Sequence, residues 1–322
     1  MKCSFTKMLP ALFLLAGLSG CIKEDRSECN PGALLKYDYS LNTEHANLFG
    51  EEVGKVTVYV FDEQGMYYGT YSDAGSHLTN SWQMLLPLPA GNYTAVTWGG
   101  LLDSYRLGET DTDETAFHSG LKKGVTHIDN FMLSAEEEGL TLQKLDALYH
   151  GKADVTSVFQ PETATTVELT KNTNLLIVTI EDESIRETAS KGGELPYEIY
   201  CKGANGRYRA DNRLGKKCAS LTYQPHKAHA ATGKMEVEID LLRLMAGQPL
   251  RLVIKDRAGK SVYDIDLIEN LRATGQYVTQ EELDCEDVYH VVLRRGTGGE
   301  GEEGVIGITI NGWVPVDIKP EL

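Results

Sequence analysis

Short stretches in which apolar and polar residues alternate recur along most of the chain. In residues 34–41 the side chains of Leu35, Tyr37 and Tyr39 share one face, and residues 56–61 form a β-branched and aromatic run. Because neighbouring side chains of a strand point to opposite faces, such patterns predict β-strands. The same reasoning predicts strands at residues 92–98, 152–159, 165–169, 175–180, 250–254, 261–267, 289–293 and 305–310, whereas residues 237–244 fit either a strand or a helix.

Turn residues separate these strands and favour an all-β sandwich fold. Residues 62–65 (Asp-Glu-Gln-Gly) and 256–259 (Asp-Arg-Ala-Gly) share one Asp-to-Gly spacing, and each lies between two strand patterns, as in a hairpin. This recurrence favours two related sandwiches. A chain of 322 residues also exceeds the usual domain of about 100–200 residues. We therefore expect domains at residues 31–169 and 170–322.

One segment of the first half departs from the strand pattern. Ser134-Ala135-Glu136-Glu137 fits the capping box of a short helix that would run to Leu145. A solvated acidic loop explains the same residues equally well, and both alternatives stay open.

The chain begins with the features of a secretion signal. Two lysines precede an apolar run at residues 8–18, which is far shorter than the roughly 20 residues that a membrane-spanning helix needs. Leu18, Ser19 and Gly20 then lead directly to Cys21. We expect residues 1–20 to be a signal peptide.

Leu18-Ser19-Gly20-Cys21 resembles the bacterial lipobox, in which the cysteine thiol receives a diacylglycerol and becomes the new N-terminus. Each buried CH₂ contributes roughly 0.8 kcal/mol to membrane binding, so several acyl chains hold almost permanently. The alternative is a plain secretion signal whose cysteine later forms a disulfide. We expect lipidation at Cys21, residues 21–30 as a tether, and no other cofactor.

Charge points to attachment by acyl chains rather than by electrostatics. Removal of Lys2 and Lys7 with the signal leaves 29 basic against 47 acidic residues, a net charge of −18. Such a chain repels nucleic acid and anionic lipid. Lys23-Glu24-Asp25 is similar to the signal that sends Bacteroides-type lipoproteins to the outer face of the outer membrane, although a solvated charge run gives the same residues.

Cysteine usage is consistent with an oxidising compartment. Once the signal is removed and Cys21 is acylated, Cys29, Cys201, Cys218 and Cys285 remain. An even number of cysteines outside the cytoplasm favours disulfides, and the sequence does not choose among the pairings. Cys201 and Cys218 flank a polar stretch that a disulfide would close.

Motifs that carry chemistry are absent from the sequence. It contains no Gly-x-Ser-x-Gly, His-Glu-x-x-His or P-loop motif and no Cys-x-x-Cys pair. His226 and His229 lie in a loop-like run and make a poor zinc site. We therefore expect no enzyme activity, no metal and no small-molecule substrate. Trp82 and Trp98 are interpreted as core residues rather than as a platform for sugars.

An ordered set of segments carries a resemblance to a known family. It comprises the lipobox with its acidic flank, Cys29-Asn30-Pro31, residues 56–65 (VTVYVFDEQG), residues 88–100 (LPAGNYTAVTWGG), residues 148–151 (LYHG) and residues 310–313 (INGW). Together they resemble the FimB-like family of Bacteroides-type fimbrial anchor lipoproteins. In one departure, Asn30 separates Cys29 from Pro31, where the family pattern has the two adjacent.

The resemblance implies two transthyretin-like Greek-key β-sandwich domains on the cell surface, fixed by lipid to the outer membrane. It implies a subunit that anchors a type V pilus, limits its length and has pilin subunits as partners. An open sheet edge offers unpaired N–H and C=O groups to another chain's strand. The segment expected to exchange strands contains Val305, Ile306, Ile308, Ile310 and Trp313; alternatively, it folds into its own domain.

A surface lipoprotein that binds glycans is the alternative function. Sandwich domains on this membrane often hold polysaccharide, and such a protein needs an exposed aromatic platform. A structure in which Trp82, Trp98 and Trp313 are all buried would weaken this alternative.

Overall fold

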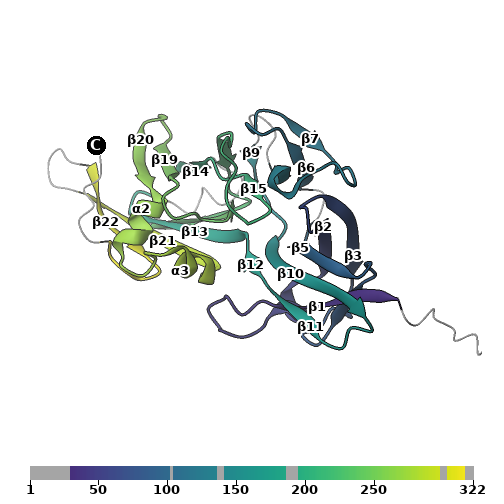
Figure 1. Ribbon diagram of the computed structural model, residues 1–322. Helices are drawn as coiled ribbons and strands as arrows, with labels where there is room; N and C mark the ends of the chain where they lie inside the picture. The colour runs from purple at the N-terminus through teal and green to yellow at the C-terminus, as the bar shows by residue number, and fades with distance from the viewer. Residues whose placement is uncertain (1–29, 102–103, 136–140, 186–194, 298–302, 316–322) are drawn as a thin grey trace, which may run out of the picture.

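The computed structural model describes residues 30–101, 104–135, 141–185, 195–297 and 303–315, and the side chains of residues 296–306 are not described. The protein is all-β, as the alternating pattern predicts, and its strands form four sheets (Figure 1). They build two β-sandwich domains and a small sheet that covers one face of the N-terminal sandwich.

The N-terminal sandwich consists of two layers that enclose one apolar core. One layer contains β3 (Tyr67–Ala74), β2 (Lys55–Asp62), β5 (Gly91–Gly99), β10 (Tyr149–Phe159) and β12 (Thr170–Lys171), and the other contains β4 (Gln83–Leu86), β1 (Pro31–Asp38) and β11 (Ala164–Glu168). Leu35 and Tyr37 of β1 pack in the same cluster as Val58 of β2. The layers join where Pro31 and Gly32 pair with the end of β10.

A small third layer covers the other face of β2 and β5. It contains β6 (Arg106–Thr110), β7 (Phe117–Ser119), β8 (Phe131–Ser134) and β15 (Arg207–Arg209). The rings of Phe61 and Phe131 lie 5.5 Å apart, and those of Trp98 and Tyr208 lie 6.2 Å apart. Strand β2 is therefore buried on both faces, which explains its continuous apolar sequence.

The C-terminal sandwich consists of two five-stranded sheets. The first contains β17 (Lys227–Ala231), β18 (Lys234–Leu242), β13 (Thr173–Glu181), β21 (Val288–Thr297) and β22 (Glu303–Ile310), and the second contains β20 (Ser261–Asp266), β19 (Leu250–Asp256), β14 (Tyr197–Gly203), β16 (Leu221–Tyr223) and β9 (Thr141–Leu142). The ambiguous residues 237–244 lie mostly in strand β18. Its Val237 and Ile239 enter the core because alternate positions of the strand are buried.

Three pairings cross the chain position at which we expect one domain to end, and one of them joins β12 to β10 within the N-terminal sandwich. Strand β9, from the first half of the sequence, pairs with β16, and strand β15, from the second half, pairs with β8. Each half thus contributes a short strand to a sheet built mainly by the other.

Helices are few and short. They are α1 (Phe49–Glu52), the 3₁₀ turn η2 (Ile128–Asn130), α2 (Leu267–Ala273) and α3 (Gln280–Cys285). The helix considered for residues 134–145 is wrong, because β8 ends at Ser134 and residues 141–142 form β9; residues 136–140 lie outside the described part of the chain. No helix in the described part is long and apolar enough to cross a membrane.

The two Asp-to-Gly turns have the same geometry, as their spacing predicts. Gly65 and Gly259 both adopt φ of 76°. The N–H of each glycine donates to the carbonyl of the aspartate three positions earlier, at 2.8 and 2.9 Å. Each aspartate side chain also accepts two backbone N–H groups of its own turn. The turn residues therefore fix the register of the β2–β3 and β19–β20 hairpins.

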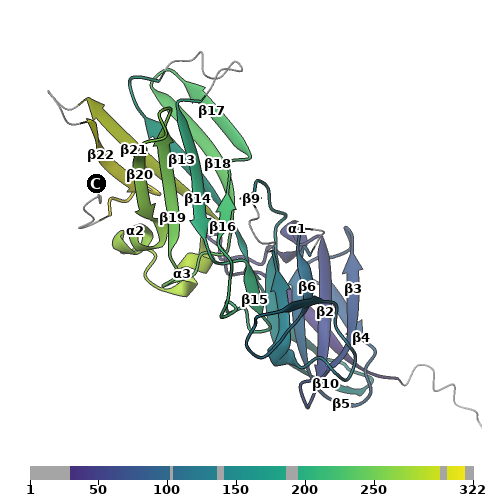
Figure 2. The same ribbon diagram turned by 90° about the horizontal axis from the view of Figure 1, so that it is seen from above.

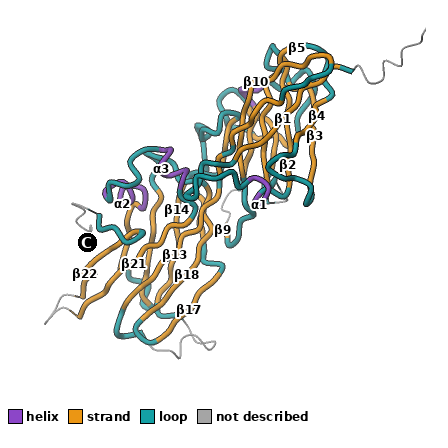
Figure 3. The backbone as a smooth tube through the Cα atoms, turned by 90° about the horizontal axis from the view of Figure 1, so that it is seen from below, coloured by secondary structure: helices purple, strands orange, loops and turns teal. Residues whose placement is uncertain are grey.

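The molecule is elongated, with one sandwich at each end (Figure 2). Strand β1 begins at the outer end of the N-terminal sandwich, near β5 and β10, whereas β22 lies at the other end of the molecule (Figure 3).

Candidate functional site: sheet edges and the domain junction

Within the described residues, β22 is the edge strand of its sheet. It pairs antiparallel with β21, with Val291 opposite Ile310 and Leu293 opposite Ile308, and a bulge lies at Arg294–Arg295. Ile310 is buried and Ile308 is partly buried against the core. The predicted exchange segment is therefore folded into the C-terminal sandwich, and its backbone forms one edge of the sheet.

A tight turn ends this strand. Asn311 and Gly312 have φ of 47° and 82°, as a two-residue type I′ turn requires. The N–H of Ile310 donates to the carbonyl of Trp313 and the N–H of Trp313 donates to the carbonyl of Ile310, both at 2.8 Å. Trp313 thus occupies the outer edge of β22 at its last residue, and its side chain is 51% exposed.

The alternation of antiparallel pairs shows which donors of β22 face outward. The N–H and C=O of Ile310 bond to Trp313, on the side of β22 that faces away from β21. Asn311 instead donates its N–H to the carbonyl of His290 in β21. Because bonded and non-bonded pairs alternate, the N–H and C=O of Ile308 point to the outer edge, whereas those of Thr309 point to β21. Ile308 is therefore the position from which another strand would extend the sheet.

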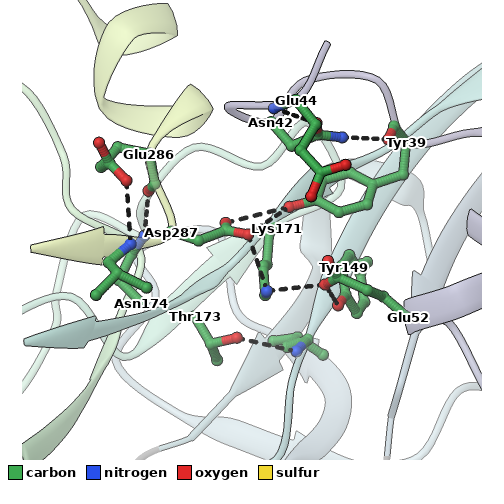
Figure 4. A network of polar contacts seen from close by, with 12 residues as sticks. Tyr39, Asn42, Glu44, Glu52, Tyr149, Lys171, Thr173, Asn174, Glu286 and Asp287 are labelled. Carbon is green, nitrogen blue, oxygen red and sulfur yellow. Dashed lines mark hydrogen bonds and ion pairs between the residues drawn. The ribbon is translucent and has the colours of Figure 1, made fainter. Parts of the chain in front are cut away.

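A polar network joins the two sandwiches (Figure 4). The ammonium of Lys171, at the end of β12, lies 2.9 Å from a carboxylate oxygen of Glu52 and 3.1 Å from one of Asp287. Tyr149 donates to Glu52 at 2.7 Å. Tyr39, which directly follows β1, donates to both oxygens of Asp287 at 3.1 Å. Asp287 directly precedes β21, so the network ties the start of that strand to the N-terminal sandwich.

The electrostatics of the network depend on this one lysine. Burial alone raises the pKa of Glu52, but hydrogen bonds from Lys171 and Tyr149 outweigh it and the pKa is lowered. Burial raises the pKa of Asp287 more than Lys171 lowers it. Burial also opposes charge on Lys171, yet the two carboxylates raise its pKa. The lysine is therefore charged and held between its two partners.

A cleft of about 1060 Å³ opens beside the junction. Four carboxylate residues line it, two from each sandwich: Asp38, Glu168, Glu281 and Glu282. Cys285 also lines it, but burial and nearby acidic groups raise the pKa of its thiol, which disfavours a nucleophilic thiolate.

Within the described residues, no group of three or more His, Cys, Asp or Glu residues is arranged to hold a metal ion. His226, considered and set aside for zinc, lies instead near Glu238 and Asp240.

The cysteines do not form the expected disulfides among themselves. No disulfide joins Cys201, Cys218 and Cys285 to one another. Cys201 lies in the middle of β14 with its side chain in the sandwich core, where burial raises its pKa. Cys218 directs its sulfur towards the carbonyl of Gly215 at 3.5 Å. The prediction is wrong for these three because the strand order, not their sequence spacing, decides where they lie. Cys21 and Cys29 lie outside the described residues.

The tryptophans do not form one platform. Trp98 is fully buried. Trp82 is partly buried and its ring stacks on that of Tyr37 at 5.9 Å. Both pack in or against cores, as expected, whereas Trp313 is exposed on the other sandwich.

A family model for the fimbrillin-A associated anchor proteins Mfa1 and Mfa2 matches residues 26–319. The chain belongs to this family. The resemblance to fimbrial anchor proteins that the sequence motifs indicate is confirmed.

Three relatives are similar to this chain over 88–98% of its length. The minor fimbrium anchoring subunit Mfa2 of Porphyromonas gingivalis is 23% identical over 331 residues, which cover 98% of this chain and 95% of the relative. The structure of that organism's fimbrial anchor protein Mfa2 has a TM-score of 0.69 at 20% identity, over 88% of this chain and 99% of the other, and shows the shared fold. A candidate polysaccharide-binding protein of Bacteroides thetaiotaomicron has a TM-score of 0.72 at 27% identity, over 88% of this chain and 96% of the other.

None of these three relatives is described as an enzyme. The junction network is the feature that sequence reasoning missed. Its members Tyr39, Glu52, Tyr149, Lys171 and Asp287 are scattered over the chain, and only the fold brings them together.

Proposed function

We propose that the protein is an outer-membrane lipoprotein that anchors fimbriae to the cell surface and limits their length. The observation that carries the proposal is the match of the fimbrial anchor family to residues 26–319, which starts five residues after Cys21. The anchoring role of the Porphyromonas gingivalis relative, named as a fimbrium anchoring subunit, supports the same assignment.

Cys21 supplies the attachment. Acylation of its thiol gives the acidic chain a hold on lipid that needs no positive charge, because the buried acyl chains provide the binding free energy. A diacylated or triacylated N-terminus dissociates slowly enough to hold a polymer. Export to the outer face, directed by Lys23-Glu24-Asp25, then exposes both sandwiches to the medium.

The fimbria contacts the anchor by β-strand addition. The outer edge of β22 has the backbone groups of Ile308 directed outward and apolar side chains inward, which is the surface that an added strand extends. A fimbrial subunit whose strand pairs there gains main-chain hydrogen bonds. An anchor that ends the stack in this way also limits polymer length, because a capped subunit offers no further edge.

Deletion of the gene tests the proposal. We expect fimbriae that are longer than in the wild type and that are shed into the medium, as seen by electron microscopy and by immunoblotting of the supernatant. Complementation with the intact gene restores short, cell-bound fimbriae. Fimbriae of unchanged length that stay on the deletion strain would contradict it.

Glycan binding is the second candidate function, favoured by the 27% identity to a candidate polysaccharide-binding protein. Trp313 is the exposed tryptophan that such a site would use. Affinity electrophoresis in surface polysaccharides tests it, with Trp313→Ala as the variant. If a polysaccharide retards the wild-type protein but not this variant, glycan binding is supported. If the wild-type protein moves equally in gels with and without polysaccharide, binding of those glycans is ruled out.

A further inference from the structure

Three large apolar side chains are exposed together at the outer end of the N-terminal sandwich. Leu85 is 56% exposed, Val158 is 46% exposed and Phe159 is 65% exposed. We call these three residues the apolar tip. They lie beside the first residues of β1, which are also the first strand residues after Cys21 in the sequence.

Strand register places Leu85 and Val158 on one face of the sheet, whereas Phe159, the next residue of β10, lies on the other face of the same strand end. Pro31 is paired with Phe159, and Gly32 with Val158. Residues that face each other in an antiparallel pair project to the same side of the sheet, so Val158 lies on the same face as Gly32. On the opposite flank, a side-chain carbon of Leu85 comes within 2.8 Å of the position that a Cβ on Gly32 would take. Leu85 and Val158 thus flank Gly32 on one face of the sheet, and the missing side chain of the glycine leaves space for them.

The outer face of this sheet changes from apolar to polar along β1. At the level of Leu34 the neighbours are Leu85 and Ala164. Two residues later, at the level of Lys36, the neighbours are Gln83 and Thr166. A face that is apolar only at its outer end is suited to partial insertion of that end into an apolar medium.

The tip is held in shape by a buried hydrogen bond. The hydroxyl of Ser157 donates to the carbonyl of Leu88 at 2.7 Å and ties the β4–β5 turn to the end of β10. Acidic residues lie nearby: Glu162 follows the tip in the β10–β11 turn, and Asp62 and Glu63 lie in the β2–β3 turn. These carboxylates favour an uncharged lipid surface over an anionic one.

We propose that the apolar tip inserts into the acyl-chain region of the bilayer that holds the lipid on Cys21. The proposal rests on the proposed function, because it requires Cys21 to be acylated. Pro31 lies ten positions after Cys21, and a stretch of that length spans at most roughly 36 Å. The lipid thereby keeps the tip close to the bilayer, so that a contact that binds only weakly by itself becomes largely occupied. Insertion at this end directs β22 away from the membrane (Figure 3).

Fluorescence quenching by lipid tests the insertion. Lipidated full-length protein carrying Phe159→Trp is reconstituted in phosphatidylcholine vesicles with or without bromine on the acyl chains. The control is Val314→Trp, because Val314 is also 65% exposed but lies in the C-terminal sandwich. We expect the added signal of Phe159→Trp, after subtraction of the wild-type signal, to fall at least twofold in brominated lipid. The added signal of Val314→Trp should be unchanged.

A second measurement uses chains without the lipid. With Cys21→Ser, the protein should float weakly with phosphatidylcholine vesicles, and the further changes Leu85→Ser, Val158→Ser and Phe159→Ser should abolish flotation without lowering the melting temperature. Mass spectrometry verifies that the protein used for quenching is acylated. If bromine then quenches both tryptophan variants equally, the insertion is overturned, but the proposed lipid anchoring still stands. A protein without acyl chains would overturn the proposed function itself. A dimer in sedimentation equilibrium that the three serines dissociate would assign the tip to a second copy and overturn the insertion.

Discussion

The ammonium of Lys171 lies 3.1 Å from the carboxylate of Asp287, although the two residues are 116 positions apart in the sequence. Lys171 ends the last strand of the first sandwich and Asp287 precedes β21 of the second. This pair therefore joins the two sandwiches, at the point that would carry tension between the proposed lipid anchor and a fimbria.

Replacement of Lys171 by Met should destabilise the protein. The change removes the cation that lies between Glu52 and Asp287, whose side chains are only 29% and 23% exposed. We expect a loss of about 1–3 kcal/mol in the free energy of unfolding, below the value for a fully buried pair because water reaches the site. Urea denaturation measures this loss.

The control for Lys171 is Arg294→Met. It breaks an ion pair with Glu181 in which both side chains are about half exposed, and we expect a cost below about 1 kcal/mol. Equal costs for the two variants would contradict the role assigned to the junction.

The stability contributed by Glu52 should depend on pH. Its pKa in the folded protein is lowered from 4.5, so its contribution is present above that value and is lost as the pH falls through the lowered folded pKa. The difference in unfolding free energy between the wild type and Glu52→Gln should therefore be constant near neutral pH and shrink in acid.

The contribution of Asp287 to stability should change with pH in the opposite direction. Its folded pKa is raised from 3.8, so its contribution is present below that value and is lost as the pH rises through the raised pKa. Urea denaturation from pH 3 to pH 7 distinguishes the two variants, Glu52→Gln and Asp287→Asn. Parallel pH profiles would show that the network is assigned incorrectly.

A proline in β22 should block strand addition without breaking the sandwich. At Ile308 the backbone N–H faces the outer edge, where proline is tolerated, whereas at Thr309 it faces β21. Ile308→Pro should lower capture of fimbrial subunits at least tenfold in pull-downs, with Ile308→Ala as the control for loss of the side chain. Thr309→Pro should instead lower the melting temperature. Undiminished capture by Ile308→Pro would exclude this edge as the contact.

Reducing agents should not destabilise the folded domains. Since Cys201, Cys218 and Cys285 form no disulfide with one another, we expect the same melting temperature with and without dithiothreitol. Cys201, which is fully buried, should react with maleimide only after addition of denaturant, as peptide mass spectrometry can measure. A lower melting temperature in reductant, or labelling of Cys201 in the native protein, would contradict this.

Local signals in the sequence predict the strands that contribute most to the cores. Residues 56–61 and 175–180 fold as predicted because their apolar faces are buried in any sandwich. The aspartate and glycine of the two hairpin turns also act locally, through bonds within the turn.

A local signal of the same kind predicts the wrong element where pairing with a distant strand determines the structure. Ser134-x-x-Glu137 fits a capping box, yet Ser134 ends a strand that pairs with β15. Thr279-x-x-Glu282 forms a true capping box and begins α3, because Leu283 behind it enters the core. The sequence therefore contains two capping-box patterns, and tertiary contacts decide which of them forms a helix. The crossings by β9 and β15 and the partners of Lys171 depend on contacts between distant segments that no local pattern encodes.

In the proposed function, a lipid on Cys21 holds the anchor and its fimbria on the cell. The most direct measurement is the distribution of the Cys21→Ser protein between the cell envelope and the culture medium, with Cys29→Ser as the control. We expect the Cys21→Ser protein, together with its fimbriae, to appear in the medium while the Cys29→Ser protein stays with the envelope. Retention of the Cys21→Ser protein in the envelope would contradict the account.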